Sequence, residues 1–78
     1  MRFDEAFATV SKHKNVYMAL PWWSDDVKVF CQFPKETYPG NRNEMTHKFL
    51  FVESRFGRVP WLPTQVELFS DEWKVRGV

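Results

Sequence analysis

A single cysteine, Cys31, in a chain of 78 residues excludes the internal disulfide that stabilises many domains of this size. The only histidines, His13 and His47, lie far apart, and neither belongs to a cluster with metal-ligand spacing. The sequence therefore predicts neither a metal nor another cofactor. It predicts one small domain over residues 1–78, which assembly into homo-oligomers stabilises beyond its own modest core.

The charges of the chain nearly cancel, with 11 basic and 10 acidic residues and a formal net charge of +1. Such a chain has no overall field that would gather duplex nucleic acid or an anionic membrane. No apolar stretch approaches the length of a bilayer span, and the first five residues lack the apolar segment of a signal peptide. We therefore expect a cytoplasmic protein that binds neither a membrane nor duplex nucleic acid.

Aromatic residues are unusually frequent, at 18% of the chain, and include four Trp and eight Phe. The Trp residues lie beside prolines and polar residues, which indicates a surface or cleft suited to a flat ring. An enzyme needs a nucleophile, a base and an orienting group. Cys31 lies within an apolar strand pattern, Asp25 and Asp26 read as a solvated turn, and no glycine-rich phosphate loop is present. The sequence thus favours a binding protein that is not an enzyme.

The local patterns predict an α+β fold. Phe3, Ala6, Phe7 and Val10 have the i, i+3, i+4, i+7 spacing of an amphipathic helix, which ends near Asn15, a residue suited to the left-handed C-cap conformation. Strands are predicted at 16–20, 27–33, 48–53 and 72–75, a short helix at 63–69, a long loop at 34–46 and a tight connection at 54–58. This order predicts a small antiparallel sheet with the N-terminal helix packed on one face and a short C-terminal helix.

The segment 58–65, Arg-Val-Pro-Trp-Leu-Pro-Thr-Gln, is followed by a short acidic stretch and by Asp71-Glu72-Trp73. It resembles the C-terminal signature of the second family of Thoeris anti-defence proteins, in which Val-Pro-Trp-x-Pro-Ser/Thr-Gln precedes an acidic helix and Asp-Trp. The family opening Phe-x-x-Ala is matched at residues 3–6, so the resemblance covers the whole chain. The family has Gly-Trp-Asn in the first turn where this chain has Pro-Trp-Trp-Ser, so its Trp corresponds to either Trp22 or Trp23.

The resemblance implies a phage protein that acts in the host cytoplasm by binding a cyclic nucleotide immune signal, notably a cyclic ADP-ribose isomer, without cleaving it. It also implies homo-oligomers, with tetramers favoured. A cyclic dinucleotide is the other ligand class that we consider, because residues 17–20 lack the basic residues common in that family strand. The alternative is a small phage inhibitor that docks directly on a host protein, since Trp, Tyr and Arg also anchor protein interfaces.

Trp61 is the first candidate for ligand binding, because Pro60 and Pro63 stiffen the backbone on both sides of it. Each base stacked on such a ring contributes roughly 1–3 kcal/mol. Thr64 and Gln65 lie at the predicted start of the short helix, where backbone N–H groups attract anions, although capping is the simpler role for Thr64.

One of the neighbouring Trp22 and Trp23 is expected to point inward and the other toward ligand. Arg55 and Arg58, on either side of Gly57, are the preferred cations because a guanidinium matches phosphate oxygens; Lys48 and Arg42 are weaker candidates. Trp73 is expected in the core or in a subunit interface, and Phe7 in the core.

Overall fold

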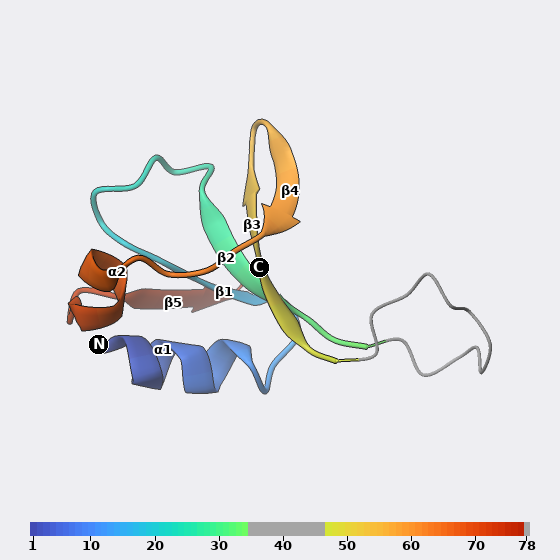
Figure 1. Cartoon of the computed structure of the whole chain (residues 1–78), viewed down its shortest axis with the longest axis horizontal. Helices are drawn as coiled ribbons and strands as arrows, with labels where there is room; N and C mark the ends of the chain where they lie inside the picture. Colours follow the sequence, from blue (N-terminus) through green and yellow to red (C-terminus); the bar gives the residue numbers. More distant parts are fainter. Residues whose placement is uncertain (35–46, 78) are drawn as a thin grey trace.

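The structure is a computed structural model and describes residues 1–34 and 47–77. The chain runs in the order α1 (Phe3–Val10), β1 (Val16–Ala19), β2 (Lys28–Gln32), β3 (Phe49–Ser54), β4 (Gly57–Pro60), α2 (Gln65–Phe69) and β5 (Lys74–Gly77). The strands form one antiparallel sheet in the order β4-β3-β2-β1-β5, and α1 lies along one face of it (Figure 1). The predicted α+β fold, with its two helices, is confirmed. The predicted loop at 34–46 lies outside the described residues from position 35 onward, as does Arg42.

The first three strands lie within one residue of their predicted bounds, and β1 and β2 form the expected antiparallel pair. The last strand begins two residues later than predicted. One of the residues predicted to start this strand is bonded to the N-terminus instead, because the backbone N–H of Trp73 donates to the carbonyl oxygen of Met1 at 3.0 Å. The amino group of Met1 donates in return to the carbonyl oxygen of Trp73 at 2.8 Å, so the start of the chain is held beside the start of β5.

The predicted tight connection at 54–58 is present but shorter than predicted, because the turn comprises only Arg55 and Phe56 and is followed by strand β4. Gly57 has a φ of 111°, a value that favours glycine, and it allows the chain to enter β4 directly from the turn. Pro60 cannot donate to a sheet, but β4 is an edge strand with a neighbour on one side only. Pro60 would argue against a strand in the middle of the sheet, but it is compatible with the edge strand β4.

The N-terminal helix follows its predicted spacing, with one exception. Ala6 and Val10 are fully buried and Phe3 is half-buried, whereas Phe7 is 42% exposed and the prediction that it lies in the core is wrong. Its ring stacks on Phe3 at 5.9 Å, at the margin of the helix face that meets the sheet. Asn15 has the expected left-handed conformation, with φ of 66°, but in the turn before β1, since the helix already ends at Val10.

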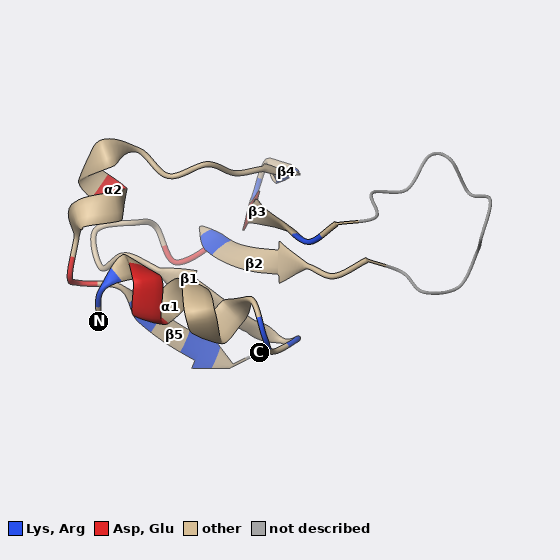
Figure 2. Ribbon diagram, turned by 60° about the horizontal axis from the view of Figure 1, so that its bottom comes forward, with Lys and Arg blue, Asp and Glu red and all other residues tan. Residues whose placement is uncertain are grey.

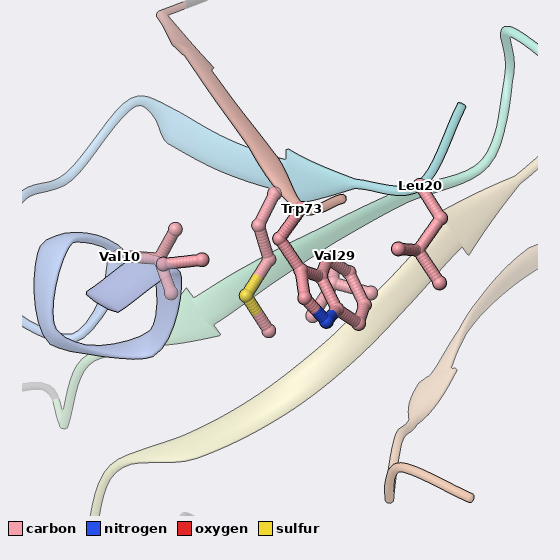
Figure 3. Close-up of a cluster of buried hydrophobic side chains, with 6 residues drawn as sticks. Val10, Leu20, Val29 and Trp73 are labelled. Carbon is pink, nitrogen blue, oxygen red and sulfur yellow. The ribbon is translucent and has the colours of Figure 1, made fainter. Parts of the chain in front are cut away.

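The core lies between α1 and the sheet (Figure 3). Val10 enters it from α1, Val29 from the central strand β2, and Leu20 from just beyond β1, with the indole of Trp73 beside Val29 (Figure 3). Ala6 and Met18 complete the buried set. The largest member, Trp73, comes from just before β5, so the last part of the chain closes the core formed by the first part.

Among the described residues, no helix has the length and apolarity needed to cross a membrane.

Candidate ligand-binding site

Three tryptophans from distant parts of the chain meet at the end of the core. The rings of Trp23 and Trp61 contact the buried ring of Trp73 in near-perpendicular arrangements, with centroid distances of 5.3 Å and 6.0 Å. Trp23 and Trp61 also contact each other, at 6.2 Å and 78°. Phe3 adds a ring from α1, 5.7 Å from Trp73 and 6.3 Å from Trp61. We call Phe3, Trp23, Trp61 and Trp73 the aromatic cluster.

The members of the cluster differ in exposure. Trp73 is 1% exposed. The general expectation that the tryptophans lie at a surface or cleft is therefore wrong for Trp73, whereas the separate prediction that Trp73 lies in the core is confirmed. Trp23 and Trp61 are half-buried and pack against the core, so part of each residue stays exposed. Each edge-to-face contact between rings contributes about 0.5–1.5 kcal/mol beyond burial, so the two accessible rings are held firmly.

The neighbouring Trp22 and Trp23 point to different environments, as predicted. Trp22 is 55% exposed, whereas Trp23 is half-buried in the aromatic cluster. The backbone N–H of Trp23 donates to the carbonyl oxygen of Leu20 at 3.1 Å, which closes the turn after β1 and directs the ring toward Trp61 and Trp73.

Thr64 caps α2. Its hydroxyl accepts a hydrogen bond from the backbone N–H of Glu67 at 3.3 Å, and the carboxylate of Glu67 accepts one from the backbone N–H of Thr64 at 2.7 Å. This reciprocal pair is a capping box. It confirms the capping role and gives two of the backbone donors at this helix start a partner within the chain. Gln65, the first residue of α2, is exposed beside the cap.

The predicted arginines lie at the β3–β4 hairpin and already have acidic partners. Arg55 donates to a carboxylate oxygen of Asp26 from its backbone N–H at 2.9 Å and from Nε at 3.1 Å. Together these bonds hold the pKa of Asp26 below its ordinary value of 3.8. Arg58 pairs with Glu53 at 3.4 Å. Arg55 is thereby tied to the turn that carries Trp23, three residues before Asp26.

Lys48, the weaker candidate cation, lies with the end of α1. Its Nζ donates to the carbonyl oxygen of Ser11 at 2.9 Å and stands 5.1 Å from the ring centroid of Phe33. The structure thus brings Trp23 together with Trp61, and Arg55 with the Trp23 turn, but not Lys48 with the tryptophans.

A pocket of about 270 Å³ that Trp23 helps to line lies between the turn after β1 and the strands β1 and β5. The residues of its lining that bear on ligand chemistry are Tyr17, Ala19, Trp23, Asp25, Lys74 and Arg76. The sequence interpretation missed the two cations of this pocket. Alternation in β5 places Lys74 and Arg76 on the same sheet face, and this spacing is visible in the sequence. The proximity of Lys74 and Arg76 to Trp23 depends on the pairing of β5 with β1, and the sequence does not show that pairing.

The described residues offer little for covalent or metal chemistry. They contain no group of three His, Cys, Asp or Glu side chains arranged to hold a metal ion. Cys31 lies on β2, where burial raises the pKa of its thiol and the charge of Lys48 only partly opposes that effect. A thiol with a raised pKa is a poor nucleophile at neutral pH. The site therefore offers rings, hydrogen-bonding groups and cations, which are groups that bind a ligand.

No curated protein matches the sequence significantly. The family model of the Tad2-like group, the Thoeris anti-defense 2-like domain, matches residues 1–76. That range includes the aromatic cluster, the capped helix α2 and all of the described strands up to Arg76 in β5. The matched range extends from the Phe-x-x-Ala opening to the Trp61 and Trp73 signature on which the sequence resemblance rests. The chain belongs to the Tad2-like family of Thoeris anti-defence proteins.

Proposed function

We propose that this Thoeris anti-defence protein binds and sequesters a cyclic nucleotide immune signal, either a cyclic ADP-ribose isomer or a cyclic dinucleotide, and does not cleave it. The observation that carries the proposal is the pair Trp23 and Trp61. Both residues are only half-buried, and both rings contact the buried Trp73. A ring that is already immobile loses little entropy when a base stacks on it, so more of the stacking free energy appears as affinity.

The residues next to Trp61 supply directional contacts in this proposal. Thr64 and Gln65 follow Trp61 by three and four residues and are both exposed. The amide of Gln65 can donate to and accept from a base or a ribose. Thr64 positions that amide by capping α2, because its hydroxyl is bonded to the backbone N–H of Glu67.

Arg55 and Arg58 are the proposed phosphate contacts at the hairpin. Their ion pairs with Asp26 and Glu53 are exposed, and exposed pairs contribute only about 0–1 kcal/mol. A phosphate group therefore competes for each guanidinium at small cost. Trp22, which is largely exposed next to Trp23, is free to cover a ligand held on the neighbouring ring.

We further propose that the protein works as a homo-oligomer, with a tetramer favoured. Helix α2 has no buried residue, and its apolar side chains Val66 and Phe69 are 71% and 84% exposed. Leu62, just before the helix, is 87% exposed. A five-residue helix is not stable in water without packing, and a second copy of the chain would bury this apolar surface. Assembly would also place residues of two subunits around one ligand.

The same apolar residues support the second candidate, a phage inhibitor that docks on a host protein. The oligomeric state separates the two functions. Light scattering on the purified protein is expected to give a mass of about four times 9.4 kDa. A monomer at high dilution, with Leu62 and Phe69 accessible to solvent, would favour docking on a host protein instead.

Calorimetry against cyclic ADP-ribose isomers and cyclic dinucleotides tests the main proposal. We expect one of these ligands to bind and to be recovered chemically intact after the protein is denatured, as judged by chromatography. Recovery of a linear product would contradict sequestration without cleavage. Absence of binding across the whole panel would contradict the ligand class, and with a monomeric state it would leave host-protein docking as the function.

A further inference from the structure

The sheet carries a second group of aromatic and basic residues on the face that points away from α1. Because side chains alternate along a strand, Tyr17 and Ala19 of β1 point away from the buried Met18 between them. Strand β5 pairs with β1 so that Arg76 stands opposite Tyr17 and Lys74 opposite Ala19. On the other side, the ring of Phe30 lies 5.6 Å from Tyr17. Tyr17 therefore lies between Phe30 on one neighbouring strand and Arg76 on the other.

The pocket opens where this face carries its smallest side chain. Ala19 lies between the longer side chains of its neighbours, and the turn after β1 adds a wall that includes Trp23 and Asp25. The resulting volume of about 270 Å³ is slightly below the roughly 300–1,000 Å³ of typical ligand pockets. It suits one nucleotide unit better than a complete cyclic dinucleotide. Trp23 belongs both to this pocket and to the aromatic cluster, so the pocket adjoins the proposed stacking site.

The cations of the pocket differ from Arg55 and Arg58 in one respect. Within residues 1–34 and 47–77, Lys74 and Arg76 take part in no ion pair, although both are exposed. Figure 2 shows the basic positions of β5 and the basic start of β2, and these two strands lie on either side of β1. The Nζ of Lys28, at that start, lies 5.0 Å from the ring centroid of Tyr17. One carboxylate, Asp25, lines the pocket against two cations, so its local charge is positive.

We propose that this pocket binds one phosphate-bearing unit of the nucleotide ligand, with the phosphate between Lys74 and Arg76 and the base or sugar against Tyr17 and Trp23. The inference rests on the proposed function and adds a second phosphate contact to the one proposed at Arg55 and Arg58. Lysine and arginine donate charge-assisted hydrogen bonds to phosphate oxygens, and the two aromatic walls match a planar group. The carboxylate of Asp25 accepts hydrogen bonds from sugar hydroxyls in the same pocket.

The test uses ADP, adenosine and inorganic pyrophosphate as probes, followed by NMR of the backbone amides of the full chain. We expect ADP to shift the amides of Tyr17, Ala19, Trp23, Lys74 and Arg76. Adenosine, which lacks the phosphates, should bind at least about tenfold more weakly, since each charge-assisted hydrogen bond lost lowers the affinity by about that factor. Pyrophosphate alone should shift the β5 amides and leave Trp23 nearly unchanged.

A double variant, Lys74→Gln with Arg76→Gln, should weaken ADP binding at least about tenfold. The matched control, Lys12→Gln with Lys14→Gln, removes the same net charge from exposed positions outside the pocket and should change the affinity less than about twofold. Circular dichroism checks that both variants fold. Equal binding of ADP and adenosine, shifts confined to other elements, or full affinity in the Lys74/Arg76 variant would overturn the inference.

The same variants separate this inference from the proposed function. If the wild-type protein binds a cyclic nucleotide and the Lys74/Arg76 variant binds it equally well, the pocket inference fails and the proposed function stands. If the wild-type protein binds no cyclic nucleotide but ADP gives the expected shifts, the proposed function fails and the pocket remains. Affinity for single-stranded oligonucleotides that increases with their length would identify a nucleic acid as the occupant and overturn the small-molecule assignment.

Discussion

The indole Nε1 of Trp73 donates a hydrogen bond of 2.8 Å to the backbone carbonyl oxygen of Glu67. Trp73 is the largest buried side chain in the core, and Glu67 lies in the short helix α2, which has no buried residue of its own. This hydrogen bond therefore attaches α2, a helix with no buried residue, to the hydrophobic core. It also sets the position of the chain between Trp61 and Trp73, which carries the proposed binding residues.

We expect Trp73→Phe to lower the free energy of unfolding by about 2 kcal/mol. About 1 kcal/mol comes from the lost hydrogen bond and a similar amount from the smaller ring in a packed core. Urea unfolding followed by circular dichroism measures the change. The control, Trp22→Phe, alters a ring that is 55% exposed and should stay within about 0.5 kcal/mol of the wild-type value. Equal stability of the two variants would contradict the role assigned to Trp73.

Trp61→Ala should weaken binding of the cyclic nucleotide at least about fivefold, since loss of one stacking ring removes roughly 1–3 kcal/mol. The variant should remain folded because the core residues do not include Trp61, although it loses contacts with Trp23 and Trp73. Calorimetry and circular dichroism on the same samples measure both effects. Phe56→Ala, which removes a ring that is 91% exposed at the β3–β4 turn, is the control and should bind normally. Unchanged affinity in Trp61→Ala would place the site elsewhere.

Thr64→Ala should lower stability by about 1 kcal/mol, because the hydroxyl that accepts the Glu67 N–H is lost and the capping box opens. Thr64→Ser keeps an oxygen in the same position and should recover most of the loss. Thermal unfolding of the three proteins gives the comparison. If alanine and serine behave alike, the cap contributes nothing to the fold.

The ion pair of Asp26 with Arg55 predicts a pH dependence. The two hydrogen bonds from Arg55 lower the pKa of Asp26 in the folded state. Ionised Asp26 therefore contributes fully to the stability of the fold above the pKa that it has in the unfolded chain. That contribution is lost as the pH falls through the lower pKa of the folded state. Asp26→Asn should therefore lose less stability than the wild type between about pH 5 and pH 2. Urea midpoints across this range measure the difference.

Arg55→Gln provides the internal comparison for that series. The largest cause of the lowered pKa of Asp26 is the backbone N–H of residue 55, which this substitution keeps. Its effect on the pH dependence should therefore be smaller than that of Asp26→Asn. An effect of equal size would mean that the guanidinium, rather than the backbone bond, dominates.

Cys31 should react slowly while the protein is folded. Burial raises the pKa of its thiol, so at pH 8 the reactive thiolate is scarcer than in the unfolded chain. We expect alkylation by iodoacetamide, followed by mass spectrometry, to be at least about tenfold slower in buffer than in concentrated urea. Similar rates in both solvents would show that the β2 position does not protect the thiol.

Most of the secondary structure follows from patterns that the sequence displays directly. The spacing of Phe3, Ala6 and Val10 defines α1, and the alternation around Val29 defines β2, because each depends only on residues close in the chain. Strand β4 was not predicted, since Pro60 argues against a strand unless that strand is known to lie at an edge. Edge position is a property of the whole sheet.

The sequence alone determined the family, the two helices, the capping residue Thr64 and the aromatic character of the site, because these reside in contiguous motifs. Only the tertiary structure decided that Trp23 and Trp61 contact Trp73, that Arg55 is held by an aspartate 29 positions away, and that Lys74 stands opposite Ala19. Those relationships depend on the order and pairing of strands. Strand order is set by the free energy of burying the whole core, and no short segment of the chain contains that information.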